Sequence, residues 1–87
     1  MKKKKYYFYL ARCSDNSLYS GSCIDIKKRE AKHNQGTGAK YTRSRRPIKI
    51  IFFEEFQTLV EARRREAQIK GWTKIKKENL IINKKGL

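Results

Sequence analysis

Five side chains with the chemistry of a phosphodiester-cleaving site are spread along this chain, the first three of them ten residues apart. A guanidinium offers planar donors that match phosphate oxygens, and an imidazole titrates near neutrality. A carboxylate can hold a hard cation such as Mg²⁺. Together with two phenols, these groups suit attack on a phosphodiester. The five residues are Tyr9, Tyr19, Arg29, His33 and Glu66.

The charge of the chain indicates the same class of partner. Lys and Arg number 23 against eight acidic residues, which gives a formal net charge of +15. Because neutralising phosphates releases condensed counterions, this charge predicts a nucleic-acid partner. The sequence has no apolar run of about 18 residues and no signal-peptide core, so we expect no membrane partner and a cytoplasmic location.

The positions of apolar and turn residues predict the elements that carry these side chains. A chain of 87 residues is one domain, here 6–82 between a basic tail at 1–5 and a C-terminal tail at 83–87. The order strand, strand, helix, strand, helix, helix predicts an α/β domain with a three-stranded antiparallel sheet flanked by helices. We expect Trp72, Ile75, Leu80 and Ile81 to cover one side of the sheet. The expected elements are strands at 6–13, 18–24 and 48–56, and helices at 26–34, 59–70 and 74–82.

The first two strands flank the turn cluster 14–17 and predict a β-hairpin. With a three-residue loop at 15–17, Tyr9 pairs with Cys23, and Tyr9 and Tyr19 lie on the same face of the sheet. A loop one residue longer or shorter would separate them, because side chains alternate with period two. The same register keeps Cys13 and Cys23 apart. Since they also lack zinc-site spacing, we interpret both as buried structural thiols.

Two helices are predicted to carry the remaining candidates. Asp25 is a good N-cap for the helix at 26–34, on which Arg29 and His33 lie one turn apart on one stripe. Thr58 opens a capping box for the helix at 59–70. Glu66 falls on the stripe of that helix that should face inward, where an ionised carboxylate is costly without a cation or strong donors. A salt bridge with Arg63 or Lys70 is the alternative explanation.

The segment 36–47, with the sequence GTGAKYTRSRRP, is small, polar and strongly basic. We expect a loop that approaches a nucleic-acid backbone closely. Contacts to phosphates fix position without reading sequence. The residues predicted to make these contacts are Lys40, Tyr41, Arg43, Arg45 and Arg46.

In order and spacing, these residues resemble the GIY-YIG nuclease family over about residues 6–82. The chain is similar to its small stand-alone bacterial members and to the N-terminal nuclease domain of an excision-repair endonuclease. Tyr7 and Ser20 depart from the glycine and isoleucine of the two motifs, at positions that supply no catalytic side-chain atoms in the family. A late asparagine of many family sites has only nearby candidates in Asn79 and Asn83. The matching segments are Tyr7-Phe8-Tyr9, Tyr19-Ser20-Gly21, Arg29, His33, 36–47 and 61–66.

The resemblance implies metal-assisted hydrolysis of a phosphodiester. Tyr19, helped by Tyr9 and His33, would position or deprotonate the attacking water, and which tyrosine is the base stays open. Arg29 would stabilise charge on the non-bridging oxygens, and one Mg²⁺ or Mn²⁺ on Glu66 would stabilise the leaving oxygen.

The expected activity is an endonuclease that nicks DNA, rather than RNA, with weak or structure-biased specificity, in DNA repair or recombination. A partner protein or a weak homodimer could supply further specificity. Two alternatives stay open. One is a catalytically weak or inactive nucleic-acid-binding module of the same fold. The other is a basic protein whose tyrosines stack single-stranded RNA bases.

Overall fold

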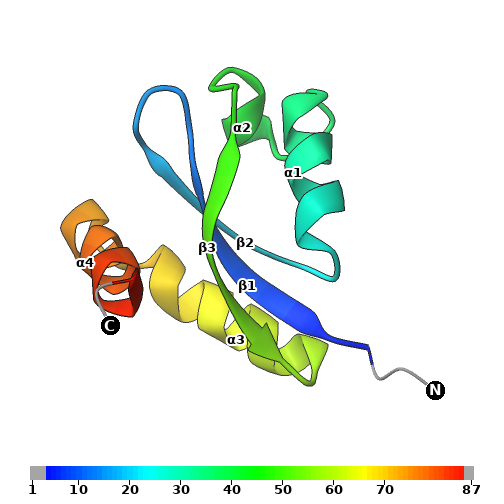
Figure 1. Cartoon of the computed structure of the whole chain (residues 1–87), viewed down its shortest axis with the longest axis vertical. Coiled ribbons are helices and arrows are strands. Elements are labelled where there is room, and N and C mark those ends of the chain that lie inside the picture. The colour runs from blue at the N-terminus through cyan, green and yellow to red at the C-terminus, as the bar shows by residue number, and fades with distance from the viewer. Residues whose placement is uncertain (1–3, 86–87) are drawn as a thin grey trace.

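The computed structural model describes residues 4–85 and has the predicted order of strands and helices (Figure 1). A short helix, α2, is added inside the segment that we predicted to be a loop, so that prediction is wrong at residues 40–43. The last helix continues to Lys85, beyond its predicted end at residue 82. Residues 1–3 of the predicted basic tail and residues 86–87 lie outside the described residues. The elements are β1 (Tyr6–Arg12), β2 (Leu18–Cys23), α1 (Ile26–Asn34), α2 (Lys40–Arg43), β3 (Lys49–Phe56), α3 (Leu59–Lys70) and α4 (Lys74–Lys85).

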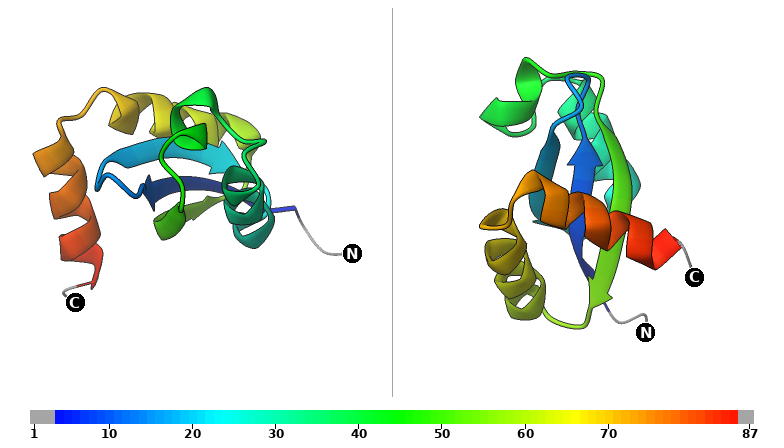
Figure 2. Two further views of the ribbon diagram at one scale, coloured as in Figure 1. Left: turned by 90° about the horizontal axis from the view of Figure 1, so that it is seen from above. Right: turned by 90° about the vertical axis from the view of Figure 1, so that its left-hand side faces the viewer.

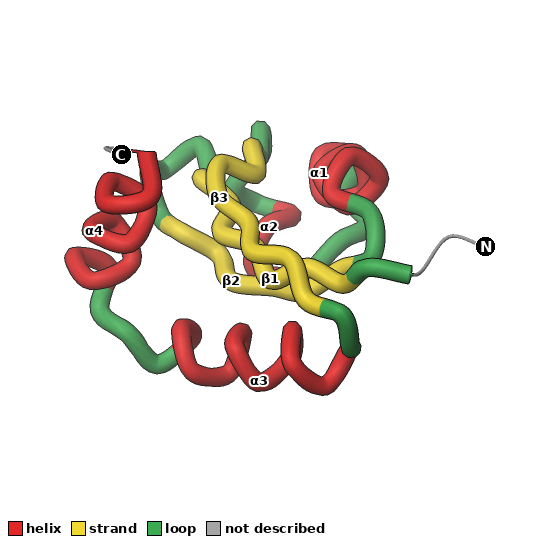
Figure 3. Tube along the Cα trace, turned by 60° about the horizontal axis from the view of Figure 1, so that its bottom comes forward, coloured by secondary structure: helices red, strands yellow, loops and turns green. Residues whose placement is uncertain are grey.

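The three strands form one antiparallel sheet in the order β2-β1-β3, with β1 in the centre. Helix α1 lies on one side of this sheet and α3 on the other, as Figure 3 shows. Helix α4 stands across one end of the domain (Figure 2). Because strand side chains alternate between faces, the sheet contributes to two separate clusters.

The α3 face of the sheet holds the main apolar core. Helices α3 and α4 each contribute one buried isoleucine, and Trp72 and Leu80 pack at its edge. These contacts confirm the predicted role of Trp72, Leu80 and Ile81. Ile75 is 75% exposed, so its predicted place on the sheet is wrong. The buried members of this core are Phe8, Leu10, Leu18, Phe52, Ile69 and Ile81.

The α1 face of the sheet holds a second cluster that includes both candidate tyrosines. Tyr9 is fully buried in it, and Tyr19 and Ile26 pack against it. Cys13 and Cys23 are both buried there and both free, as predicted for structural thiols. This face carries both candidate tyrosines and packs against α1, the helix of Arg29 and His33.

The hairpin places the two tyrosines as required, although the predicted register is wrong by two residues. Tyr9 pairs with Gly21, not with Cys23. The turn begins one residue earlier than expected: the Cys13 amide donates to the Ser17 carbonyl at 2.9 Å, and Asn16 takes a left-handed φ of 69°. A left-handed third residue is typical of three-residue hairpin loops. Because a shift of two preserves the alternation, Tyr9 and Tyr19 still share a face.

Side-chain caps fix the ends of the two helices that carry candidate residues. The Asp25 carboxylate accepts from the Lys28 amide at 3.0 Å and begins α1. The Thr58 hydroxyl accepts from the Glu61 amide at 3.2 Å and begins α3. Both caps confirm the sequence predictions. No helix among the described residues is long and apolar enough to cross a membrane.

Candidate active site

A hollow of about 290 Å³ opens where β2, α1 and the segment after α1 meet. Tyr19 forms part of its wall, and Arg29 and His33 enter it from successive turns of α1. Three of the five predicted site residues therefore share one cavity. We call it the Tyr19 hollow; its lining residues are Tyr19, Arg29, Lys32, His33, Thr37, Gly38 and Ala39.

Tyr9 lies beneath this hollow and is inaccessible to solvent. Its hydroxyl oxygen is 2.8 Å from Nε2 of His33. Gly21, the pairing partner of Tyr9 on β2, leaves room for the phenol: a Cβ at that position would lie 2.5 Å from the hydroxyl oxygen. The structure thus joins Tyr9 to the site through His33, while Tyr19 is the tyrosine that reaches the cavity.

His33 is held on its other side by the segment that follows α1. Its Nδ1 lies 2.9 Å from the Thr42 hydroxyl, which donates to the Ala39 carbonyl at 2.9 Å. Gly38 packs so closely that a Cβ there would collide with the imidazole. Thr42 and Gly38 were not singled out from the sequence, because their roles depend on where α2 folds back onto α1.

Burial keeps both members of the Tyr9–His33 pair neutral. Loss of water raises the pKa of Tyr9, and the nearby Arg29 charge only partly opposes this rise. Burial lowers the pKa of His33, and the positive charges of Arg29 and Lys32 lower it further. A buried phenol with a raised pKa is a poor proton acceptor. Tyr9 is therefore suited to donating a hydrogen bond.

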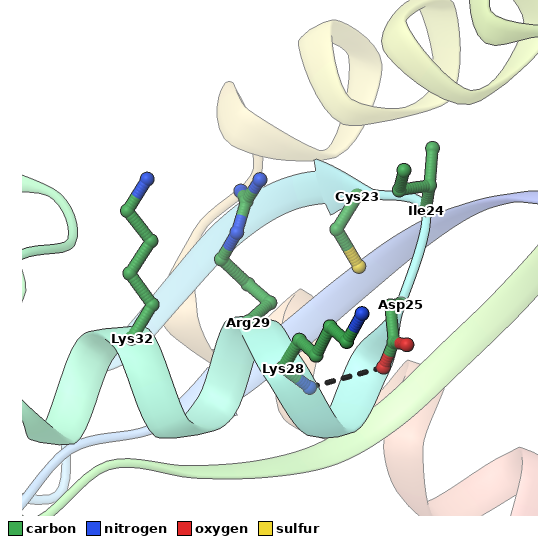
Figure 4. A pocket seen from close by; sticks show the side chains of 6 residues that line it. All are labelled: Cys23, Ile24, Asp25, Lys28, Arg29 and Lys32. Carbon is green, nitrogen blue, oxygen red and sulfur yellow. Dashed lines mark hydrogen bonds between the residues drawn. The ribbon is translucent and has the colours of Figure 1, made fainter.

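Arg29 links the Tyr19 hollow to a second hollow of about 280 Å³ at the start of α1. Its Nη1 donates to the Ser22 carbonyl of β2 at 3.0 Å. In Figure 4, Lys28 and Lys32 rise from α1 on either side of Arg29. Both lysines are missing from the residues predicted to bind nucleic acid. Their sequence positions were a signal, because residues four apart lie on the same side of a helix and Arg29 lies between them. The second hollow is lined by Cys23, Ile24, Asp25, Lys28, Arg29 and Lys32.

Of the predicted nucleic-acid contacts, Tyr41 and Arg45 stack on the site. The Tyr41 ring stacks on Tyr19 at 6.0 Å between centroids, and the Arg45 guanidinium lies 3.9 Å from the centre of the Tyr41 ring. Arg45 also pairs with Asp15 at 3.0 Å. Tyr9 is buried and Tyr41 stacks on Tyr19, so Tyr41, 39% exposed, is the ring of this group that is open to solvent.

The other basic residues of this segment divide into two groups. Arg46 donates to the carbonyls of Arg43 and Asn34, at 2.9 and 3.2 Å, and so holds the segment against α1. The side chains of Lys40 and Arg43 are exposed on α2. Of the four basic residues predicted to contact nucleic acid, Lys40 and Arg43 are the two whose side chains make no hydrogen bond or ion pair among the described residues.

Glu66 lies on α3, which covers the opposite face of the sheet from α1. It shares the inward stripe with Ala62 and Ile69, as predicted, and its side chain is 21% exposed. Its carboxylate pairs with Lys70 at 3.2 Å, which is one of the two partners that the sequence suggested. In residues 4–85, no hydrogen bond or ion pair joins Glu66 to the Tyr19 hollow.

The donor set fits a hard, oxygen-binding divalent ion better than a metal that needs several imidazole or thiolate ligands. Within the part of the chain that the structure describes, no three His, Cys, Asp or Glu side chains gather into a metal site. Mg²⁺ commonly binds through one carboxylate, with waters and substrate phosphate completing its shell. Glu66 offers such a carboxylate, and Lys70, 58% exposed, is free to swing away from it.

Comparison with known proteins identifies the family of this arrangement. Residues 5–79 match the family model of the GIY-YIG catalytic domain. The chain therefore belongs to the GIY-YIG family. This is a nuclease family, and the two tyrosine motifs of the name correspond to the hairpin that places Tyr9 and Tyr19 on one face.

Small GIY-YIG proteins of similar length are similar to this chain. A UPF0213 protein from Bacillus pumilus is 47% identical over 81 residues, covering 93% of this chain and 83% of its own length. The UPF0213 protein SSP2268 from Staphylococcus saprophyticus is 49% identical over 77 residues, covering 88% of this chain and 94% of its own. These relatives confirm the predicted resemblance to the stand-alone branch.

Two structures solved by NMR share the GIY-YIG fold described above. The protein EF2693 from E. faecalis is 40% identical, with a TM-score of 0.62, covering 94% of this chain and 88% of its own. The UPF0213 protein BH0048 from Bacillus halodurans is 39% identical, with a TM-score of 0.57, covering 88% of this chain and 82% of its own. The predicted fold class is thereby confirmed.

Proposed function

We propose that this GIY-YIG protein is a metal-dependent endonuclease that hydrolyses phosphodiester bonds in DNA. The observation that carries the proposal is the Tyr19 hollow, in which a phenol, a guanidinium and an imidazole line one cavity. Lys32 adds a second cation to the same wall. A concave site with two cations and two proton-carrying groups suits a phosphate diester.

The residues of the hollow divide the work of hydrolysis. Arg29 binds the non-bridging oxygens and stabilises the charge that builds on them. Tyr19, the tyrosine that reaches the cavity, positions the attacking water. The water oxygen adds to phosphorus, and one ester oxygen leaves with the bonding electrons. In the products, the proton lost by water is carried by that oxygen.

Glu66 is the residue that would hold a divalent ion, Mg²⁺ or Mn²⁺. When bound, such an ion supplies Lewis-acid stabilisation of the leaving oxygen. Without the ion, the ammonium group of Lys70 pairs with the Glu66 carboxylate from an exposed position. A bound ion would take the place of this ammonium group. The role of Glu66 is a proposal that rests on the family and on its donor chemistry.

The substrate is held mainly by its backbone. Lys28 and Lys32 flank Arg29 along α1, and Lys40 and Arg43 are exposed on the adjoining α2. Phosphate contacts fix position without reading bases, so we expect weak or structure-biased specificity. One site per chain favours nicking of one strand, in DNA repair or recombination in the cytoplasm, with a partner protein or a weak homodimer supplying further specificity.

A nucleic-acid-binding module without catalysis is the second candidate. The observation that favours it is the position of Glu66, which pairs with Lys70 and makes no hydrogen bond to the hollow within the described residues. The cations around the hollow would serve binding as well as they serve catalysis. The two functions differ in what Tyr19 and Glu66 contribute.

Cleavage assays on labelled branched, single-stranded and duplex DNA separate these functions. We expect wild-type cleavage that needs Mg²⁺ or Mn²⁺ and is lost in Tyr19→Phe and Glu66→Ala. Matched controls are Tyr6→Phe and Glu55→Gln, which change the same residue types away from the hollow and should retain activity. Binding without cleavage by every version, in either metal, would overturn the nuclease and leave the binding module.

Binding of the DNA backbone by the lysines of α1 is tested separately. The affinity for a DNA duplex is measured against salt for Lys28→Gln with Lys32→Gln, and for the control pair Lys27→Gln with Lys49→Gln, which line neither hollow. Each lost phosphate contact reduces the salt slope by about 0.9, so we expect a reduction of about 1.8 for the first pair and less for the control. Equal slopes for the two pairs would place the DNA elsewhere.

A further inference from the structure

We propose that Thr42 is a positioning residue that holds His33 as the Nδ1–H tautomer, so that Nε2 accepts the proton of the Tyr9 hydroxyl. This inference deepens the proposed function by assigning a direction to the hydrogen bonds behind the Tyr19 hollow. Thr42 is itself fully buried and does not line the hollow. It can act on substrate only through His33.

The direction follows from the group at the end of the chain of hydrogen bonds. The Ala39 carbonyl can only accept, and the Thr42 hydroxyl lies 2.9 Å from it with donor geometry. A hydroxyl has one proton. Once that proton is given to Ala39, Thr42 can only accept from His33, whose Nδ1 is 2.9 Å away. Nδ1 must therefore carry a hydrogen.

The second imidazole nitrogen is then determined as well. A neutral imidazole has one N–H, so Nε2 presents a lone pair to Tyr9. The Tyr9 hydroxyl, 2.8 Å away, donates to it. In the other tautomer, Thr42 would have to give up Ala39 in order to donate to Nδ1, and Nε2–H would donate to the Tyr9 oxygen. The buried Tyr9 hydroxyl proton would then have no acceptor among the hydrogen bonds of the described residues, which is costly.

The surroundings leave the imidazole no other way to satisfy its nitrogens. His33 is 1% exposed, and Tyr9 and Thr42 are fully buried. Gly38 closes over the ring on the Nδ1 side, and Gly21 closes over the Tyr9 hydroxyl. The nearest charged groups, Arg29 and Lys32 of α1, are both cations that disfavour a doubly protonated ring. The tautomer is therefore set by Thr42 and not by solvent.

The consequence for the site is a fixed wall behind Tyr19. The imidazole contacts the Tyr19 ring edge to face, at 5.4 Å between centroids. Tyr41, one residue before Thr42, stacks on the Tyr19 ring. The short helix α2 thus orients Tyr19 through two contacts, directly through Tyr41 and indirectly through Thr42 and His33.

Nitrogen-15 NMR of the imidazole tests this directly, because His33 is the single histidine of the chain. At a pH where the ring is neutral, we expect the wild-type Nδ1 resonance in the protonated range and Nε2 in the lone-pair range. Thr42→Ser keeps the hydroxyl and should keep the pattern. Thr42→Val keeps the shape, removes the acceptor, and should shift the population toward the Nε2–H form.

Two results would overturn the proposal: a wild-type ring protonated at Nε2, or an unchanged tautomer in Thr42→Val. Should the valine variant fail to fold, the wild-type and serine spectra still decide between the two tautomers. The tautomer is read without activity, so a protein with the Nδ1–H ring that cuts no DNA would refute the nuclease and keep this inference. Where cleavage is measured, we expect Thr42→Val to lower kcat by about 10- to 100-fold through misplacement of Tyr19. The separate variant Thr42→Ser, which keeps the hydroxyl, should retain the wild-type kcat.

Discussion

The two faces of the sheet are buried in different ways. On the α3 face, the sheet residues Phe8, Leu10 and Phe52 meet isoleucines of α3 and α4, and the contact is apolar. On the α1 face, the sheet buries Tyr9 against His33, and hydrogen bonds satisfy the polar atoms. A small domain has little core to spare. Here one face supplies most of the apolar contact, and this allows the other to hold a polar site.

The largest expected effect on stability lies on the α3 face. Ile69 is fully buried in the apolar core, and Ile69→Ala should lower the free energy of unfolding by about 2 to 5 kcal/mol. Ile75→Ala, at a position 75% exposed, is the matched control and should change it by less than about 0.5 kcal/mol. Urea unfolding measures both. Equal losses would mean that the outer side of α4 is covered.

Alternation along the strands predicted this division of faces, because a shift of two residues in strand pairing leaves every side chain on the same face of the sheet. The hairpin register predicted from the sequence is off by two residues, yet Tyr9 and Tyr19 keep their common face. The position of the turn was missed, although Asn16 belongs to the residue types that most readily take the left-handed conformation it adopts. Register depends on that single residue, whereas the choice of face does not.

The site was predictable only where one element carries the signal. Arg29 and His33 lie on one helix, so their common side followed from their spacing. The roles of Thr42 and Gly38 depend on a fold of the chain back onto α1, and a basic, glycine-containing segment gives no sign of it. A local sequence pattern is enough to predict which face of an element a side chain lies on. A contact between two elements can be predicted only when the position of the second element is known as well.

On the α1 face, Gly38 fits closely against the His33 ring. A Cβ there would collide with the His33 ring, so Gly38→Ala should lower the free energy of unfolding by about 1 to 3 kcal/mol and disturb the imidazole spectrum. Gly71→Ala is the matched control, because Gly71 ends α3 with a φ of −81° and its nearest neighbour is 3.8 Å away. Urea unfolding that finds the two variants equally stable would show that the ring can move aside.

The two sides of the domain should also respond to acid at different pH. Arg12 of β1 pairs with Glu78 of α4, and this hydrogen-bonded contact lowers the pKa of Glu78 from 4.5 to about 2. Between those values the unfolded chain binds more protons, so the free energy of unfolding falls as pH falls from about 4.5 to 2. The pKa of His33 is lowered from 6.5 by burial, so the free energy of unfolding also falls as pH drops below about 6.5, a loss that begins at a higher pH than the loss from Glu78.

Acid titration of two variants tests the lower of these windows. Glu78→Gln should reduce the loss below pH 4.5 and cost about 1 to 2 kcal/mol at pH 7, because both partners are about a quarter exposed and solvent screens the pair. Glu55→Gln, whose Lys5 partner is more than half exposed, is the control and should change little. A loss below pH 4.5 that persists in Glu78→Gln would assign it to another carboxylate.

The smallest expected effect is a gain in stability at Ser20, a buried polar residue on the α3 face. Ser20 is 3% exposed, and its hydroxyl has no hydrogen-bond partner among the described residues. A buried hydroxyl without a partner is costly, so Ser20→Ala should raise the free energy of unfolding by about 1 kcal/mol. Ser22→Ala, two residues along the same face and only half-buried, should change it by less than about 0.5 kcal/mol. A loss of stability in Ser20→Ala would mean that the hydroxyl is satisfied, and that the α3 face is less purely apolar than the contrast with the α1 face requires.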